Sequence, residues 1–215
     1  MSEATFAQRR FSDDFAGILR RRILDGEMKG GDRLNEVQLS NEYGISRSPI
    51  REALMALAGE GLVTFVAGKG AFVREVTVQE VRELGQVREA LESFAVELVA
   101  QNATPEQLEA LAENSGVGAS SGVVSDDDFH RTILDLAGNE RLTQYASHVI
   151  ARLRMARSRS AGVPGRVEDA AAEHAAILTA IRAGDTSAAS EAMRSHLRAA
   201  TESASAALEQ AQGEN

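Results

Sequence analysis

Apolar side chains between residues 13 and 25 recur about every 3.6 positions, which predicts an amphipathic helix. A second, shorter helix is predicted over residues 35–43. Asn35 is a favoured N-cap, Gln38 stands at the capping-box position, and Gly44 suits the left-handed end of a helix. The chain therefore begins with two helices of unequal length.

A third helix is predicted to begin at Ser46 or Ser48, with Pro49 in its first turn, where the missing N–H is tolerated. Its buried stripe is expected to consist of Ile50, Leu54 and Leu57. Residues 63–73 then read as two short apolar strands around a glycine-containing turn, a pattern that predicts a β-hairpin. Three helices followed by a hairpin predict a winged helix-turn-helix.

From residue 76 onward the pattern is helical throughout. The predicted helices cover residues 78–102, 105–113, 126–137, 140–160, 167–183 and 187–210. Residues 114–125, rich in glycine and serine, are predicted to form a flexible loop, and residues 161–165 a second break. The expected fold is mainly all-α: a winged helix-turn-helix over residues 1–75, then a six-helix antiparallel bundle over residues 76–215.

Composition sets the class of protein. Hydrophobic residues make up 43% of the 215 residues and charged residues 26%, as in an ordinary globular chain. The sequence has no apolar run of membrane-spanning length, and its first ten residues lack the apolar core of a signal peptide. The absence of cysteine excludes disulfides and thiolate metal sites. A cytoplasmic protein without membrane association is expected.

The net charge of −9 is unevenly distributed. Residues 1–77 hold 11 basic and 11 acidic residues, whereas residues 78–215 hold 12 basic and 21 acidic residues. A neutral first part can still gather its arginines on one face. The acidic second part is a poor phosphate binder and a candidate site for a cation or an effector.

Arg47 and Arg51 share one face near the start of the third predicted helix, the end that enters the DNA major groove in helix-turn-helix proteins. Arginine is suited to bidentate contact with guanine. Ser46 and Ser48 can bind phosphates beside them. The alternative is that both arginines are ordinary solvated residues, but the order helix, turn, helix, hairpin favours a DNA-reading role.

The hairpin tip, with Gly68 and Lys69, is predicted to touch the DNA backbone or minor groove. For Lys69 a merely solvated position is equally compatible with the sequence.

Residues 34–40, 44–54 and 60–63 resemble the GntR family of bacterial transcription regulators, and the resemblance spans nearly all of residues 11–75. It implies base contacts by Arg47 and Arg51 and a wing-tip contact by Gly68. Some members carry a further arginine in the second helix, where this chain has Val37.

The four histidines all lie in the second half of the chain. Asp126 and His130 are one helical turn apart, while His174 and His196 each lie on an apolar face of a later helix. Three histidines and a carboxylate on inward faces match a transition-metal site. The alternative is that the histidines are core residues and that residues 126–128 are a charged first turn favoured by the helix dipole. His148 is expected to be structural or exposed.

Residues 126–130, 137–139, 173–178, 180–185 and 196–197 resemble the FCD effector domain of the FadR-like branch, in its shorter VanR-like version, over about residues 78–210. In metal-binding members the matching positions carry the ligands, here Asp126, His130, His174 and His196. Zinc, nickel and manganese all suit such ligands. Arg88 matches an arginine common in this domain and would suit an effector carboxylate. An ion pair of Arg88 with Glu92 is an equally good interpretation.

These patterns predict a homodimeric DNA-binding transcription regulator that reads a palindromic operator, is controlled by a small organic acid bound at a divalent metal, and is not an enzyme. Ligand binding would act through the linker at residues 74–77 and the helix at residues 78–102. Three alternatives stay open: the metal ion is itself the signal, the metal is structural, or the second domain is a metal-dependent hydrolytic enzyme. No suitably placed general base supports the last.

Overall fold

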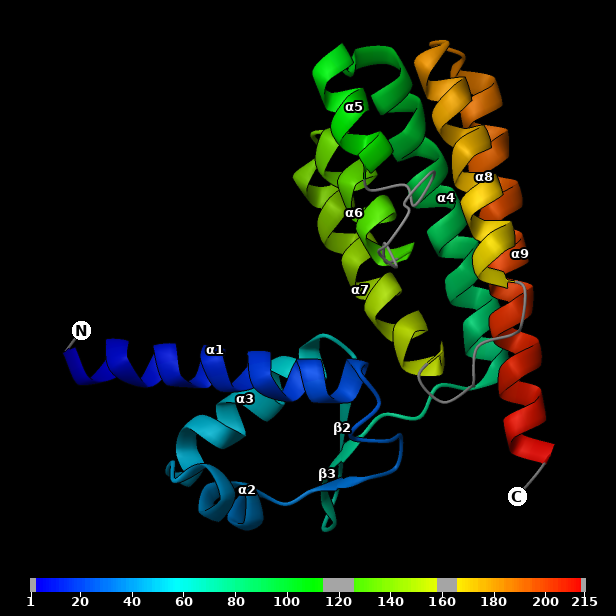
Figure 1. Ribbon diagram of the computed structural model, residues 1–215. Helices are drawn as coiled ribbons and strands as arrows, with labels where there is room; N and C mark the ends of the chain where they lie inside the picture. The colour runs from blue at the N-terminus through cyan, green and yellow to red at the C-terminus, as the bar shows by residue number, and fades with distance from the viewer. Residues whose placement is uncertain (1–2, 114–125, 158–165, 214–215) are drawn as a thin grey trace. The chain divides into compact units, whose positions relative to one another are not determined.

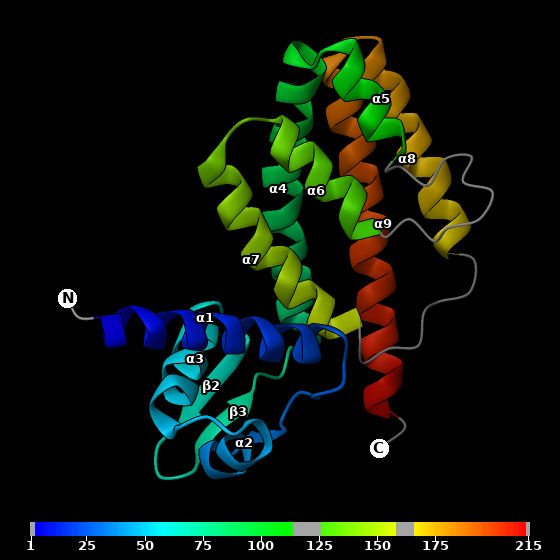
Figure 2. The same ribbon diagram turned by 60° about the vertical axis from the view of Figure 1, so that its left-hand side comes forward.

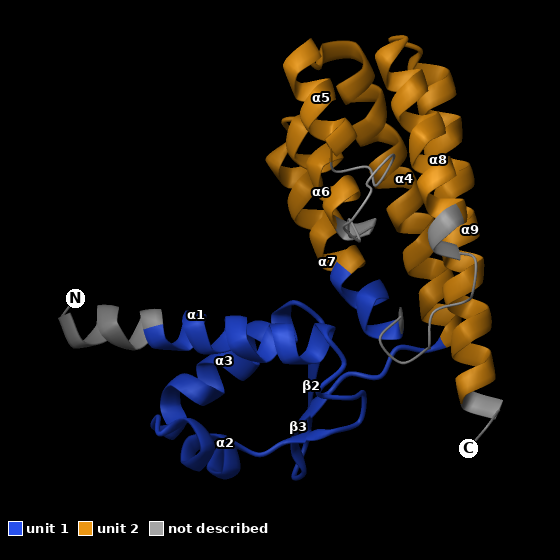
Figure 3. Ribbon diagram, viewed as in Figure 1, with its two compact units in different colours: residues 1–77, 151–159 blue, residues 78–150, 160–215 orange. Residues whose placement is uncertain are grey.

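The computed structural model describes residues 3–113, 126–157 and 166–213 and divides into two compact units (Figure 1, Figure 3). Unit 1 comprises residues 1–77 with residues 151–159, and unit 2 comprises residues 78–150 with residues 160–215. The predicted loop at residues 114–125 and the predicted break at residues 161–165 lie outside the described residues. Within the described part of the chain, no helix combines the length and apolarity needed to cross a bilayer.

Unit 1 is a winged helix-turn-helix, as predicted. Its elements are α1 (Glu3–Leu24), β1 (Arg33–Leu34), α2 (Glu36–Tyr43), α3 (Arg47–Gly59), β2 (Val63–Val66) and β3 (Gly70–Val73). The strands form an antiparallel sheet in the order β1-β3-β2. Two details differ from the prediction. Helix α1 begins ten residues earlier, and β1 pairs with β3 of the hairpin. Strand β1 was not predicted because two residues are too few to show an alternating pattern.

Local signals in the sequence set the ends of α2 and α3. The side chain of Asn35 accepts hydrogen bonds from the backbone N–H groups of Val37 and Gln38, at 2.9 and 3.2 Å, and so caps α2. Gly44 ends α2 in the left-handed conformation, with φ of 66°. Ser46 is the N-cap of α3. The expected stripe of α3 is fully buried and consists of Ile50, Leu54 and Leu57.

Unit 2 is the predicted helical bundle. Its helices are α4 (Val78–Asn102), α5 (Pro105–Glu113), α6 (Asp126–Leu136), α7 (Glu140–Arg157, with its last turns in unit 1), α8 (Arg166–Arg182) and α9 (Thr186–Gly213). Helix α9 runs beside α4 and α8 (Figure 1, Figure 2). A Cβ atom at Gly85 of α4 would lie 2.4 Å from Thr201 Oγ1 of α9, so this glycine permits the close approach of the two helices.

The core of unit 2 lies where α4, α6, α8 and α9 meet. Phe129 and Ile133 of α6 are 0% exposed, and so are Ile177 of α8 and Met193 of α9. Each of these residues lies one turn or less from a histidine on its own helix. The apolar faces that the periodicity predicted therefore point inward, and they carry three histidines with them.

Candidate DNA-reading surface and candidate metal centre

Arg47 and Arg51 lie at the start of α3 with most of their side chains in solvent, 66% and 69% exposed. Glu36, at the start of α2, faces both of them. Its Oε2 lies 3.5 Å from Arg47 Nη2, and its Oε1 lies 3.8 Å from Arg51 Nε. The two arginines are therefore held near one carboxylate while remaining accessible to a ligand.

Ser46 and Ser48 are exposed at the N-terminus of α3. The Ser46 side chain makes no capping hydrogen bond, and Ser48 Oγ donates to Glu52 Oε1 at 3.4 Å. A helix N-terminus attracts anions through its backbone N–H groups and its dipole. Hydroxyls and helix terminus together form a surface suited to a phosphate.

The wing tip is the turn between β2 and β3. Gly68 has φ of 72°, and a Cβ atom built there would meet nothing within 4 Å. The backbone N–H of Lys69 donates to Val66 O at 3.0 Å, and the Lys69 side chain is exposed. The tip therefore presents open backbone and a cation. On α2, Val37 is 50% exposed.

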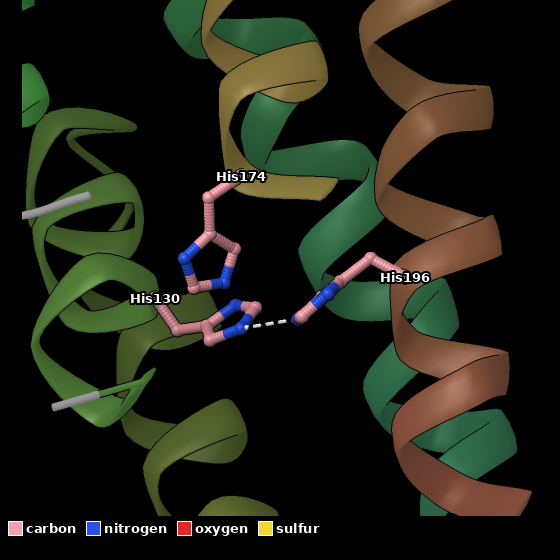
Figure 4. A group of neighbouring side chains, drawn as sticks. All are labelled: His130, His174 and His196. Atoms are coloured by element: carbon pink, nitrogen blue, oxygen red, sulfur yellow. Dashed lines mark hydrogen bonds between the residues drawn. The ribbon is translucent and has the colours of Figure 1, made fainter. Parts of the chain in front are cut away.

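Three predicted metal ligands converge from three helices, as Figure 4 shows: His130 from α6, His174 from α8 and His196 from α9. Each offers one ring nitrogen, and these atoms all lie within 4.8 Å of one another. His130 Nε2 lies 2.9 Å from His196 Nε2 (Figure 4). The three residues are 0%, 4% and 0% exposed, respectively. The Phe129 ring stacks on His174 with 4.0 Å between ring centroids.

Asp126 and His148 do not belong to this cluster of described side chains. Asp126 begins α6, but its side chain lies outside the described residues, so the fourth predicted ligand stays a prediction. His148 is exposed on α7, as expected.

Two carboxylates lie behind the histidines, and the sequence analysis gave neither of them a role at the metal. Glu92 Oε2 of α4 lies 2.5 Å from His130 Nδ1, and Glu173 Oε2 of α8 lies 2.6 Å from His196 Nδ1. Glu173 was visible only as part of the FCD motif. Glu92 was visible only as the possible partner of Arg88.

Arg88 and Glu92 form a buried ion pair, the alternative that the sequence left open. Arg88 Nε donates to Glu92 Oε1 at 2.5 Å, and the side chains are 2% and 0% exposed. Burial raises the pKa of Glu92, but the positive charge of Arg88 and the hydrogen bonds from His130 and Arg88 outweigh this effect, and the pKa is about 2. Glu92 is therefore a carboxylate at neutral pH, held between the arginine and the first histidine.

An exposed pair of arginines on a helix-turn-helix, joined in one chain to a helical domain with a buried polar centre, defines a DNA-binding transcription regulator. Comparison with known proteins gives the family. Residues 12–73 match the bacterial regulatory proteins of the gntR family, and residues 83–199 match the FCD domain. The chain belongs to the GntR family and carries an FCD domain.

The relatives agree with this assignment. The uncharacterised HTH-type transcriptional regulator YdhC of Bacillus subtilis (strain 168) is 30% identical, with 85% of each chain covered. The crystal structure of a GntR regulator from Rhodococcus sp. RHA1 is 25% identical with a TM-score of 0.71, covering 95% of this chain and 98% of that one. These relatives are transcriptional regulators and not enzymes, which confirms that part of the prediction.

A third structure bears on the second domain. It is described as the metal-free FCD domain of TM0439, with 22% identity and a TM-score of 0.51, and covers 63% of this chain and 99% of that one. This likeness shows the fold alone. FCD domains can bind metal, and the cluster of three histidines is present in this chain.

Proposed function

We propose that this regulator reads a palindromic operator as a homodimer, and that a small carboxylate metabolite bound at a divalent metal in the FCD domain controls its binding to DNA. The observation that carries the proposal is the convergence of three buried histidines, from helices far apart in sequence, in a chain that also carries a DNA-binding domain. A buried histidine cluster of this kind is the donor set that zinc, nickel and manganese accept.

The residues fit such an ion. His130, His174 and His196 would supply three nitrogen ligands, and Asp126 would supply an oxygen ligand. A bound metal would act as a Lewis acid that attracts the carboxylate of the effector. Arg88 would bind the same carboxylate in competition with Glu92, which now holds its guanidinium at 2.5 Å. An effector changes DNA binding only if it prefers one of two arrangements of the domains.

Arg47 and Arg51 are the proposed base-reading residues. Phosphate or minor-groove contacts are proposed for four further residues: Ser46, Ser48, Gly68 and Lys69. Replacing Arg47 or Arg51 with alanine should weaken binding to an operator selected from random duplexes by about 1–3 kcal/mol. Arg21→Ala is the matched control, because Arg21 is exposed in the same unit on α1. Equal affinity of wild type and both variants would refute the assignment of the reading helix.

The proposed dimer uses α4. Val87 and Phe94 are 47% and 48% exposed and lie seven residues apart, so they share one face of a helix whose other face is buried. A second copy placed by a two-fold axis would cover this face with the same residues and present two reading helices to a palindrome. Phe94→Glu should give a monomer by sedimentation. Tyr145→Glu, which changes an aromatic residue on α7 that is 62% exposed, should leave the dimer intact.

The metal assignment is tested by the double substitution His174→Ala with His196→Ala. Mass spectrometry should find stoichiometric metal in the wild type and none in the variant, and full metal content in the variant would refute the site. Titrating operator binding with zinc, with and without small organic acids, separates metabolite control from control by the ion alone. A response to zinc that organic acids do not change assigns the signal to the ion.

A further inference from the structure

The two carboxylates behind the histidine cluster point to a role in the metal centre beyond that of its ligands. We infer that Glu92 and Glu173 are positioning residues, which hold His130 and His196 as Nδ1–H tautomers with each Nε2 turned to one common point. This inference rests on the proposed metal centre. It adds two residues that act through the ligands and do not touch the ion.

Hydrogen-bond chemistry fixes the tautomers. An ionised carboxylate accepts hydrogen bonds and donates none. Glu92 receives the Arg88 guanidinium on Oε1, so its Oε2 can receive His130 Nδ1 at 2.5 Å only if that nitrogen carries a hydrogen. The same reasoning applies to His196 Nδ1, which lies 2.6 Å from Glu173 Oε2. In a neutral ring with a hydrogen on Nδ1, the lone pair is on Nε2.

Both lone pairs then face each other. His130 Nε2 and His196 Nε2 are 2.9 Å apart, and the rings are nearly parallel at 24°. Two lone pairs at this separation repel unless a cation, either a proton or a metal ion, is shared between them. A metal ion about 2.0–2.1 Å from each nitrogen satisfies both. The two carboxylates therefore create a paired donor set that favours a shared cation.

The carboxylates also tie the helices of unit 2 together at this point. Glu173 and His174 are adjacent on α8, so this helix supplies one ligand and orients another ligand on α9. Helix α4 supplies no histidine and contributes Glu92 instead. The otherwise unfavourable burial of Glu92 is compensated by Arg88 one turn before it. Arg88 thus supports His130 through Glu92, a role separate from effector binding.

The test measures zinc affinity by competition with a chromophoric chelator. Glu92→Gln and Glu173→Gln should each raise the zinc Kd by about 10- to 100-fold. The control is Glu89→Gln, one turn before Glu92 on α4 and paired with Arg198 on the surface, which should leave the Kd unchanged. Because Glu92→Gln leaves Arg88 buried without a carboxylate, the double substitution Arg88→Met with Glu92→Gln provides a second variant without the unpaired charge.

A second measurement reads the tautomers directly. Long-range ¹H–¹⁵N spectra of the metal-free wild type should show His130 and His196 with hydrogen on Nδ1, and the glutamine variants should show a mixture. Hydrogen on Nε2 in the wild type, or a zinc Kd equal in wild type and folded variants, would overturn the positioning role alone. A wild-type protein that binds no zinc would overturn the metal centre, and with it the role of both carboxylates.

Discussion

Each unit of this regulator contains an arginine facing a glutamate, and the two arrangements differ in burial. In unit 1, Glu36 lies 3.5 and 3.8 Å from Arg47 and Arg51, whose side chains are two-thirds exposed. In unit 2, Glu92 holds Arg88 at 2.5 Å, and both side chains are fully buried. The same pair of functional groups therefore serves two purposes.

Water explains the difference. Exposed ion pairs are screened and contribute about 0–1 kcal/mol, so the proposed exchange of Glu36 for DNA by Arg47 and Arg51 would cost little. A buried pair has lost its hydration, and removing one partner leaves an uncompensated charge in the core. The loose arrangement suits a surface that must change partners. The tight arrangement suits a scaffold that would keep the proposed metal ligands in place.

The largest expected effect is on the buried pair. Arg88→Ala leaves Glu92 buried without its strongest counter-charge and should lower the free energy of unfolding by about 3–5 kcal/mol. Arg47→Ala should change it by less than about 0.5 kcal/mol, since the residue is exposed and its pair is long. Urea unfolding monitored by circular dichroism measures both. Equal stabilities of the two variants would mean that burial does not distinguish the pairs.

The sequence predicted the helices of both units and the hairpin of unit 1 because their signals are local. The periodicity of α4 and α5 gave both helices with the bounds that the structure shows. The caps at Asn35 and Gly44 located α2. The same periodicity predicted that His130, His174 and His196 lie on inward helix faces. It did not predict that their side chains meet at one point.

Local sequence patterns could not predict which residues contact the histidines. Glu92 and His130 are separated by 38 positions, and His130 and His196 by 66 positions. Without knowledge of how α4, α6 and α9 pack, no spacing relates these residues. Glu36 was missed for a similar reason, because it lies 11 positions before Arg47 and on another helix. In both units, the contacts between these side chains therefore depend on tertiary packing.

The next effect compares helix packing inside unit 2 with an exposed helix end in unit 1. Gly85→Ala places a methyl group 2.4 Å from Thr201 Oγ1 and should destabilise the bundle by about 1–3 kcal/mol. Gly59→Ala, at the exposed end of α3 with nothing within 4 Å of the added Cβ, is the matched control and should not destabilise the protein. Thermal unfolding of both variants gives the comparison. A stable Gly85→Ala variant would show that α4 and α9 separate easily.

A smaller effect is expected from the carboxylate of the DNA-reading surface. Glu36→Gln removes a negative charge beside Arg47 and Arg51 and should strengthen binding to random-sequence DNA by about 0.2–1 kcal/mol. Operator binding should gain less, because the two arginines lose the group that orients them, so the ratio of specific to random affinity should fall. Fluorescence anisotropy on both duplexes measures the ratio. A higher ratio would show that Glu36 only repels DNA.

The last comparison separates a polar side chain that caps a helix from one that is available for a ligand. Asn35→Ala removes a cap that accepts two hydrogen bonds and should destabilise unit 1 by about 1 kcal/mol. Ser46 makes no capping bond, so Ser46→Ala should leave stability unchanged and weaken DNA binding by about 0.5 kcal/mol. Since phosphate contacts carry no sequence information, this loss should be equal on operator and random DNA. A loss confined to the operator would place Ser46 on a base instead.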